Sequence, residues 1–475
     1  MKKFLAIMLA AAAMLSAAAC GSTDVVHGIK KGVQVEESTA ALSDEEYFDS
    51  VFTPVIRFVV ASDVHITDEV CNEEKERLAA MFSVAYDYAD AQEDYTALDA
   101  VWFAGDYCDQ GTWNSMVKFR RLVEENIREG TQYRTILGNH EYYHDPENTV
   151  LFMKETFGYD SEDAHITVGD FHFIFLSPDE NGKGYSEAKQ KWLSEQLEIA
   201  YKDDPTGQRP IFVFQHHHVK NTVYGSVRWG VEDLTEVLST YPQVIDFSGH
   251  SHFPINDPRS VWQGAFTCLG TGTLSYGEYG IAGLYPDSVW PADDCGGYTT
   301  TEPWAAGGEK VKDTAQFYIV EVDANYAVKV QGYDLLSDSF FMEPLYFRSV
   351  GDPELFTYTE ARAETSETPY WPFETEYEAE LDEEGILNIS FTQAACADTV
   401  QNYRCELYAG HGDGELLQTE YRLSDTMYVP APELIRVTFA GLDPMGDYTV
   451  KIIPVSSWEK EGEALEFTLG SDPEN

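Results

Sequence analysis

Basic residues are scarce in this chain. Its 475 residues include 31 lysines and arginines against 82 aspartates and glutamates, which gives a formal net charge of -51. A surface this negative repels the phosphate backbone of nucleic acids and anionic membranes, so we expect no nucleic-acid partner. The net charge does not exclude small anionic substrates, because a pocket can carry local cations of its own.

Long apolar runs are absent after the amino terminus, so no later segment is expected to span a bilayer. The start, MKKFLAIMLAAAAMLSAAACGSTD, has two lysines, an apolar stretch and then small residues, which is the layout of a secretory signal peptide over residues 1–20. SAAACGS resembles a bacterial lipoprotein processing site, which implies that Cys20 carries lipid. We expect an extracytoplasmic protein that lipid on Cys20 anchors to the outer face of a bacterial membrane, or a secreted one after ordinary signal cleavage.

Cysteines are also few, and their spacing fits no zinc-finger pattern. Export would permit disulfides, and Cys396 with Cys405 is a candidate pair on neighbouring predicted strands. Unpaired buried thiols are the alternative, and the spacing does not decide between them. The cysteines after the lipoprotein site are Cys71, Cys108, Cys268, Cys295, Cys396 and Cys405.

A polar tether is expected over 21–50, and the chain after it has two regions with different sequence patterns. Over 51–350, apolar strands such as VIRFVVASD and LDAVWFAGD alternate with helical stretches such as SEAKQKWLSEQLEIAY, which indicates an α/β layered domain. Over 365–475, short alternating segments indicate an all-β sandwich. There, GLDPMGDYTVKI resembles the tyrosine-corner region of fibronectin type III domains, with Tyr448 as the corner residue. A loop-rich insertion over 277–312 either walls a substrate pocket or is plain decoration.

Side chains that bind metals follow five predicted strands of the first domain, where each strand ends. Ligands of open α/β sheets gather at the carboxyl ends of strands, so these five loops are expected to converge on one crevice. Each motif alone has a simpler explanation: Gly-Asp is an ordinary turn, and GNHE is a helix cap through Asn139. Together they indicate a metal site. The five segments are VVASDVH, WFAGDYCD, TILGNHEYY, FVFQHHH and IDFSGHSHFP.

These motifs, in this order between residues 55 and 335, resemble the calcineurin-like metallophosphoesterases. The resemblance rests on Asp63-x-His65, Gly105-Asp106-x-x-Asp109, Gly138-Asn139-His140-Glu141, His216 and Gly249-His250-x-His252. It implies a four-layer α/β/β/α sandwich with two metal ions at its rim.

The resemblance also implies a role for each residue. One ion would be held by Asp63, His65 and His252, and the other by Asn139, His216 and His250, with Asp106 bridging them. Among three consecutive histidines we choose His216, which comes first after the strand, and keep His217 as the fallback ligand. His140 would lie beside the substrate and donate to a phosphoryl oxygen or protonate the leaving group, with Asp109 orienting it.

Carboxylate, amide and imidazole ligands suit two divalent ions of Mn, Fe, Zn or Co, and no thiolate is present to favour softer ions. Two such ions outweigh the charges of Asp63 and Asp106, so a net charge of about +2 would remain to attract phosphate. A hydroxide that bridges the ions would be the nucleophile of an in-line displacement. Purple acid phosphatases use a tyrosine where this chain has Asp109, so we expect no iron–phenolate bond.

We therefore expect an exported hydrolase that cleaves phosphomonoesters or phosphodiesters with a dinuclear metal centre. The alternative is a catalytically inactive cell-surface binding protein with a phosphatase-like domain. The expected partners are a small phosphate ester and a membrane only through lipid on Cys20. Contact of the C-terminal module with the cell wall stays open, and a spacer is the simpler role for that module.

Overall fold

The computed structural model describes residues 42–179, 181–204, 206–277, 303–304, 309–310, 314–412, 414–424 and 434–470. The predicted signal peptide, the lipid site at Cys20, Cys295 and most of the insertion lie outside these residues. Two compact units are distinguished, Met1–Phe52 and Thr53–Asn475. In the first, helix α3 (Asp44–Ser50) begins at a capping box of Ser43 and Glu46, so the predicted tether ends in a helix.

Two mixed sheets form the centre of the larger unit. In the first sheet β1, β2 and β3 are parallel neighbours, and β12 adds to β1 in the antiparallel sense. In the second sheet β5, β6, β7 and β9 are parallel. The first sheet has the order β14-β13-β12-β1-β2-β3, with β15 paired to β13, and the second has the order β4-β5-β6-β7-β9-β8.

The strands of the first sheet are β1 (Pro54–Ala61), β2 (Ala100–Phe103), β3 (Gln132–Thr135), β12 (Gln316–Asp323), β13 (Val328–Asp334), β14 (Ser339–Phe340) and β15 (Leu345–Phe347). The strands of the second are β4 (Ala164–Val168), β5 (Phe171–Phe175), β6 (Ile211–Phe214), β7 (Val244–Ser248), β8 (Val261–Gln263) and β9 (Thr267–Gly270).

The two sheets pack face to face over an aromatic core. Phe58 of β1 contacts Phe173 of β5 edge to face, with ring centroids 5.2 Å apart, and Trp102 of β2 lies 5.0 Å from Phe175. Because the opposite face of each sheet is covered by helices, the parallel strands are buried on both sides and read as continuous apolar runs. The core between the sheets is therefore the middle of a layered sandwich.

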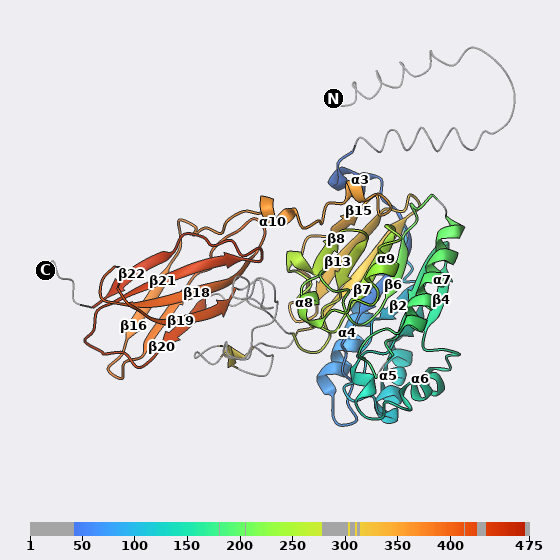
Figure 1. Cartoon of the computed structure of the whole chain (residues 1–475), viewed down its shortest axis with the longest axis horizontal. Coiled ribbons are helices and arrows are strands. Elements are labelled where there is room, and N and C mark those ends of the chain that lie inside the picture. Colours follow the sequence, from blue (N-terminus) through green and yellow to red (C-terminus); the bar gives the residue numbers. More distant parts are fainter. Residues whose placement is uncertain are drawn as a thin grey trace, which may run out of the picture. The chain divides into compact units, whose positions relative to one another are not determined.

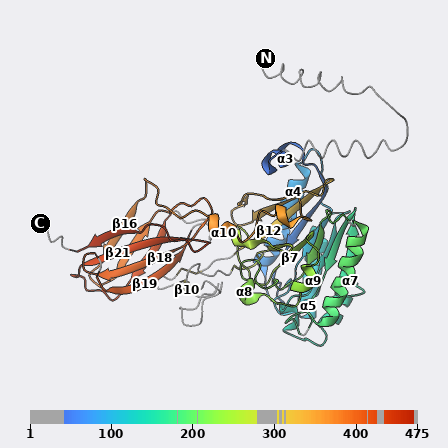
Figure 2. The same ribbon diagram turned by 45° about the horizontal axis from the view of Figure 1, so that its top comes forward.

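Helices cover the outer face of each sheet, as Figure 1 shows and Figure 2 shows from another side. Helices α4 (Asn72–Asp90), α5 (Trp113–Asn126) and α6 (Thr149–Phe157) pack on the first sheet. Helices α7 (Glu187–Asp203) and α9 (Thr235–Leu238) pack on the second. Helix α4 buries Leu78, Met81, Phe82, Ala85, Tyr86 and Ala89, a spacing of three and four that places its apolar side chains on one face. The predicted four-layer α/β/β/α sandwich is confirmed.

The C-terminal segment consists of two antiparallel sheets around a core of their own, so the predicted all-β architecture is confirmed. The hydroxyl of Tyr448 accepts a hydrogen bond from the Asp443 N–H (2.8 Å) and donates to its carbonyl oxygen (3.1 Å), which is a tyrosine-corner contact. The relation to fibronectin type III domains stays a prediction. One sheet holds β16 (Tyr377–Leu381), β17 (Leu387–Phe391) and β20 (Ile435–Phe439), and the other β19 (Leu416–Leu423), β18 (Val400–Ala409), β21 (Tyr448–Ser456) and β22 (Leu465–Leu469).

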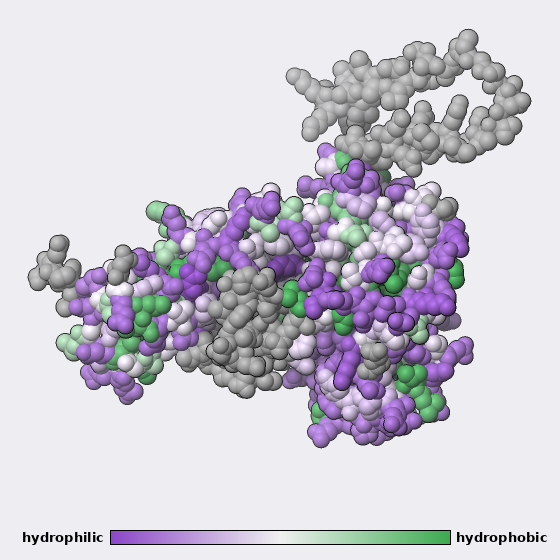
Figure 3. Space-filling model, in the orientation of Figure 1, coloured by the Kyte–Doolittle hydropathy of each residue, from purple (hydrophilic) through white to green (hydrophobic). Residues whose placement is uncertain are grey.

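Short elements complete the described ranges. They are η1 (His140–Tyr142), α8 (Ser226–Trp229), η2 (Pro258–Ser260), β10 (Pro303–Trp304), β11 (Glu309–Lys310), η3 (Pro353–Leu355) and α10 (Arg362–Thr365). No helix in the described ranges combines the length and the apolar content that crossing a membrane requires. Hydrophilic side chains cover most of the face drawn in Figure 3, as the acidic composition predicts.

All five cysteines in the described part of the chain are free thiols. The candidate pair Cys396 and Cys405 is therefore not formed, and the alternative of unpaired thiols holds. Cys405 is buried in β18, whereas Cys396 lies outside the strands and its Sγ donates to the Glu367 carbonyl oxygen at 3.4 Å.

Candidate metal centre

The loops that follow β1, β2, β3, β6 and β7 bring the seven predicted donors together at one edge of the sandwich. The first three strands are parallel neighbours in one sheet and the last two in the other, so their carboxyl ends release side chains toward a common crevice. The donors divide into two groups that share one residue.

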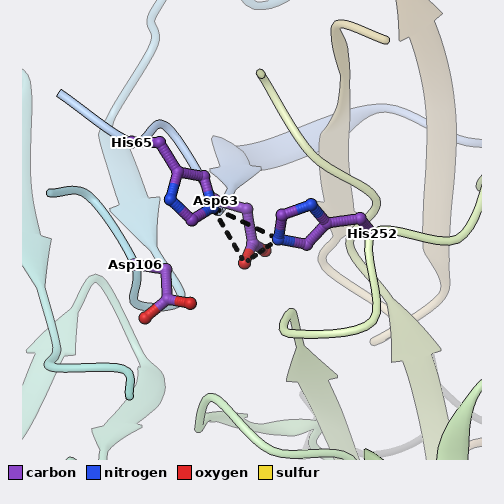
Figure 4. Close-up of side chains that lie close together, drawn as sticks. All are labelled: Asp63, His65, Asp106 and His252. Carbon is purple, nitrogen blue, oxygen red and sulfur yellow. Dashed lines mark hydrogen bonds and ion pairs between the residues drawn. The ribbon is translucent and has the colours of Figure 1, made fainter. Parts of the chain in front are cut away.

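The first group consists of Asp63, His65, Asp106 and His252, whose ligand atoms all lie within 4.8 Å of one another. His252 Nε2 is 3.0 Å from Asp63 Oδ1 and 3.2 Å from His65 Nε2. Figure 4 shows Asp63, His65 and His252 converging, while Asp106 comes from a neighbouring loop. These four side chains are buried.

The second group consists of Asp106, His216 and His250, again within 4.8 Å. Asn139 joins it, because His216 Nε2 lies 3.0 Å from Asp106 Oδ2 and 3.0 Å from Asn139 Oδ1. Asp106 thus belongs to both groups, at the position where a bridging ligand was predicted. The structure places all seven donors where the prediction requires; their role as ligands stays a prediction.

The donor atoms at the centre are oriented to accept rather than to donate. His216 Nδ1 donates to the Ala104 carbonyl oxygen (2.9 Å), and His252 Nδ1 donates to the Tyr276 carbonyl oxygen (2.9 Å). In the neutral imidazole this leaves the lone pair on Nε2, which faces carboxylate oxygens in both cases. The buried Asp106 Oδ2 has His216 Nε2 as its polar neighbour, at 3.0 Å. Acceptors gathered in this way fit a cation, and their chemistry fits divalent transition-metal ions.

Burial and neighbouring charges shift the pKa values of the donors in different directions. Burial alone would raise the pKa of Asp106, but His216 and His140 hold it well below its usual range, so the carboxylate is ionised. Burial, together with His217 and His216, holds the pKa of His250 well below its usual range, so this imidazole is neutral. Burial also lowers the pKa of His216, but the charges of Asp106 and Asp63 outweigh it and raise that pKa to about 9. The excess of negative charge around His216 is what a metal ion would neutralise.

The backbone at the donors is strained. Five donors have left-handed φ: Asp63 (53°), His65 (53°), Asp106 (49°), His250 (72°) and His252 (56°). Non-glycine residues in this region cost on the order of 1–3 kcal/mol each and collect at functional sites. The adjacent glycines are required for another reason, since a side chain at Gly138 would collide with the Asp106 carboxylate and one at Gly249 with that of Asp63.

His140 lies beside the two groups; its predicted place beside a substrate stays a prediction. Its ring contacts His65 with centroids 4.5 Å apart, and its Nε2 is 3.9 Å from Asp106 Oδ2. Asp109 orients it mainly through the backbone, because His140 Nδ1 donates to the Asp109 carbonyl oxygen at 2.8 Å while the Asp109 carboxylate is 3.6 Å away. Burial lowers the pKa of His140, but Asp109 and Asp106 outweigh it and raise that pKa to about 9. The negative charge around His140 favours its protonated form, and in that form it could donate a proton.

Sequence reasoning missed Glu141 as a structural residue. This fully buried carboxylate accepts hydrogen bonds from the backbone N–H groups of Asp106 (3.0 Å), Gly138 (2.6 Å) and Cys108 (2.8 Å). It therefore fixes the loop after β2 to the loop after β3. The interpretation of GNHE as a helix cap is wrong, because Asn139 makes no side-chain cap hydrogen bond to η1. The presence of a glutamate in a motif expected to be buried was the signal that could have indicated this structural role.

The remaining histidines of the FVFQHHH segment have different surroundings. The fallback ligand His217 packs against His250, with ring centroids 4.5 Å apart, but its ring joins neither donor group. His218 was missed: its two ring nitrogens bond Ser248 Oγ and Ser251 Oγ, each at 2.7 Å. Because Ser251 separates His250 from His252, His218 braces the loop that carries both donors.

Tyr107 takes no part in the centre. Its ring is buried against Phe119 (4.8 Å) and Phe157 (5.6 Å), in the core under the helices of the first sheet. Tyr107 is therefore not placed to serve as a ligand, and the expectation that the site has no phenolate ligand stays a prediction.

Comparison with protein families gives a match over the first part of the larger unit. Residues 56–254 match the family model described as calcineurin-like phosphoesterase, and all seven donors fall within that segment. No curated protein matches the chain.

Two similarities to solved structures are distant. One is to the purple acid phosphatase PPD1 from yellow lupin (Lupinus luteus) seeds, with 13% identity over 61% of this chain and 53% of that chain and a TM-score of 0.41. The other is to the third fibronectin III domain of human KIAA0343 protein, with 13% identity over 23% of this chain and 90% of that chain and a TM-score of 0.16. The chain thus spans about half the length of the phosphatase.

Proposed function

We propose that this protein is an exported, metal-dependent phosphoesterase that hydrolyses small phosphomonoesters or phosphodiesters. The observation that carries the proposal is the convergence of seven candidate metal ligands, with Asp106 in both groups, inside the segment that matches the calcineurin-like phosphoesterase model. Asp63, His65 and His252 would hold one divalent ion and Asn139, His216 and His250 the other, with Asp106 shared. Two ions of Mn, Fe, Zn or Co bound there would supply positive charge for a phosphoryl group and lower the pKa of an attacking water.

The protein itself would contribute a proton donor, His140, which the fold holds beside the two donor groups. His140 holds one proton on Nδ1 toward the Asp109 carbonyl oxygen, so the second proton of the imidazolium lies on Nε2, toward the donor groups. Donation from Nε2 to a phosphoryl or leaving-group oxygen leaves the neutral tautomer that the carbonyl already favours. His140 therefore returns to a state that the structure stabilises.

The decisive test replaces the shared donor. The full chain with Asp106→Ala should lose more than about a hundredfold in kcat/KM toward 4-nitrophenyl phosphate or its bis ester, because even the outer partners of metal ligands are worth 10–100-fold. Asp170→Ala, in the exposed β4–β5 turn, is the matched control and should keep wild-type turnover. Undiminished turnover in Asp106→Ala would contradict the assignment.

Metal analysis separates this proposal from the inactive binding protein. Two ions per chain in the wild type support a phosphoesterase, and fewer than one supports the binding protein. A panel of 4-nitrophenyl phosphate, its bis ester, cyclic nucleotides and glycerophosphodiesters then distinguishes a monoesterase from a diesterase.

Export and anchoring are part of the proposal and rest on the sequence alone. The signal-peptide layout of residues 1–20 and the small residues before Cys20 support a lipid anchor at the outer face of a bacterial membrane. Metabolic labelling with a fatty-acid analogue should label the wild type and leave Cys20→Ala unlabelled. A chain that carries no label but is found outside the cell would be a secreted protein.

A further inference from the structure

One exposed aromatic side chain lies against His140. Tyr143 directly follows η1, exposes 54% of its surface, and its ring centroid is 4.4 Å from that of His140. Two other aromatic rings contact the site's histidines, Trp229 beside His250 and Tyr276 beside His252, but both are partly buried. Tyr143 therefore presents the largest exposed aromatic surface next to His140 in the described part of the chain.

The ring of Tyr143 is held in place at both ends. Its backbone N–H bonds the His140 carbonyl oxygen at 3.2 Å, and its hydroxyl accepts a hydrogen bond from Asn139 Nδ2 at 2.7 Å. The same amide presents Oδ1 to His216 Nε2 at 3.0 Å. A rigid aromatic side chain loses little conformational freedom when a ligand stacks on it, which is why tyrosine is effective at binding surfaces.

The surroundings of His140 determine where a leaving group would lie. Nδ1 is bonded to the Asp109 carbonyl oxygen, and His65 packs edge to face on the imidazole at an interplanar angle of 79°. Nε2 is left to meet the leaving-group oxygen, so the organic part of the ester must extend from there past the neighbouring rings. Tyr143 is the neighbour that faces solvent.

We propose that Tyr143 is a specificity-determining residue that favours phosphate esters with an aromatic leaving group, which stacks on the tyrosine ring. This inference rests on the proposed function. Stacking on an aromatic side chain typically corresponds to about a threefold to tenfold gain in affinity. The ring provides this gain, whereas the hydroxyl positions the ring and Asn139, so the two contributions can be separated by substitution.

The test compares the full-length wild type, Tyr143→Leu and Tyr143→Phe after loading with the same metal. kcat/KM is measured for phenyl phosphate and cyclohexyl phosphate, which match in size and differ in aromatic character. Tyr143→Leu should lower the ratio of kcat/KM for phenyl phosphate to that for cyclohexyl phosphate about threefold to tenfold. Tyr143→Phe should keep that ratio because the ring remains. Tyr201→Leu, on helix α7 with 38% exposure, is the matched control and should not change it.

Binding gives a readout that does not depend on turnover. Calorimetry with phenylphosphonate and cyclohexylphosphonate should show tighter binding of the phenyl compound to the wild type, and loss of that preference in Tyr143→Leu. The inference is overturned if the wild type binds the two compounds with equal affinity. It is also overturned if Tyr143→Leu lowers the affinity for both compounds equally. A wild type that cleaves no ester would refute the proposed function, and the phosphonate comparison would still decide the role of Tyr143.

Discussion

The buried carboxylate of Glu141 accepts a hydrogen bond from the backbone N–H of Asp106 at 3.0 Å, and so holds the loop of the shared donor from behind. Two further backbone N–H groups, of Gly138 and Cys108, bond the same carboxylate. Glu141→Ala would leave three buried donors without acceptors, at about 1–3 kcal/mol each. We expect the free energy of unfolding of Glu141→Ala, measured in urea, to fall by more than about 3 kcal/mol.

Glu141→Gln should have a smaller effect, because its single oxygen can still accept from two of the three groups. Glu155→Ala, an exposed position on helix α6, is the control and should match the wild type. If Glu141→Ala unfolds at the wild-type urea concentration, the carboxylate does not hold these loops.

Removal of metal should destabilise the chain. A ligand that binds only the folded state at a thousand times its Kd adds about 4 kcal/mol of stability. We expect a chelator to lower the Tm of the wild type by roughly 5–15 °C in calorimetry, and added Mn²⁺ or Zn²⁺ to restore it. Asp106→Ala should show little response to either treatment. Equal responses in the two proteins would place the metal elsewhere.

His218 should act on metal affinity without contacting the metal. Its bonds to Ser248 and Ser251 brace the loop between His250 and His252, and outer partners of this kind are worth 10–100-fold in affinity. We expect His218→Leu to weaken metal binding by about that factor in competition with a chelating dye. Ser251→Ala, which removes one of the two bonds, should weaken it less. His411→Leu, an exposed position of the β module, serves as the control.

Asp246 makes stability depend on pH. Burial in β7 raises its pKa from 3.8 to about 7, although Gln215 Nε2 donates to it at 3.0 Å. Between these pH values the folded state holds a proton that the unfolded state releases, so the stability this proton contributes is lost as the pH rises toward 7. From pH 5 to pH 7.5, the wild type should therefore lose about 2–3 kcal/mol relative to Asp246→Asn in urea unfolding. Parallel curves for the two proteins would show that the group does not titrate in this range.

The sequence was informative where a local pattern has a direct spatial consequence. A buried parallel strand followed by Asp63, Asp106 or His250 predicts a side chain at the carboxyl edge of a sheet, and the structure places all three there. The layered fold followed from the same alternation of apolar strands with amphipathic helices.

Contacts between distant residues could not be predicted in this way. The Ala104 carbonyl that orients His216 is 112 positions away in the sequence, and Ser251 is 33 positions from His218. Cys396 lies in a loop and not on the predicted strand beside that of Cys405, because the sequence locates strand ends poorly. Tyr143 is only three positions from His140, but the sequence does not show that its ring stays exposed while it packs on that imidazole.

The left-handed turns at Asp63, His65, Asp106, His250 and His252 bear on any attempt to move this centre into another scaffold. Grafting seven side chains onto regular strands or helices would reproduce their identities but not their directions, since regular elements offer no such backbone. A host would need loops already bent in this sense at five places, and enough stability in reserve to tolerate them. The part that would have to be transferred is therefore the set of turns, together with the side chains that they carry.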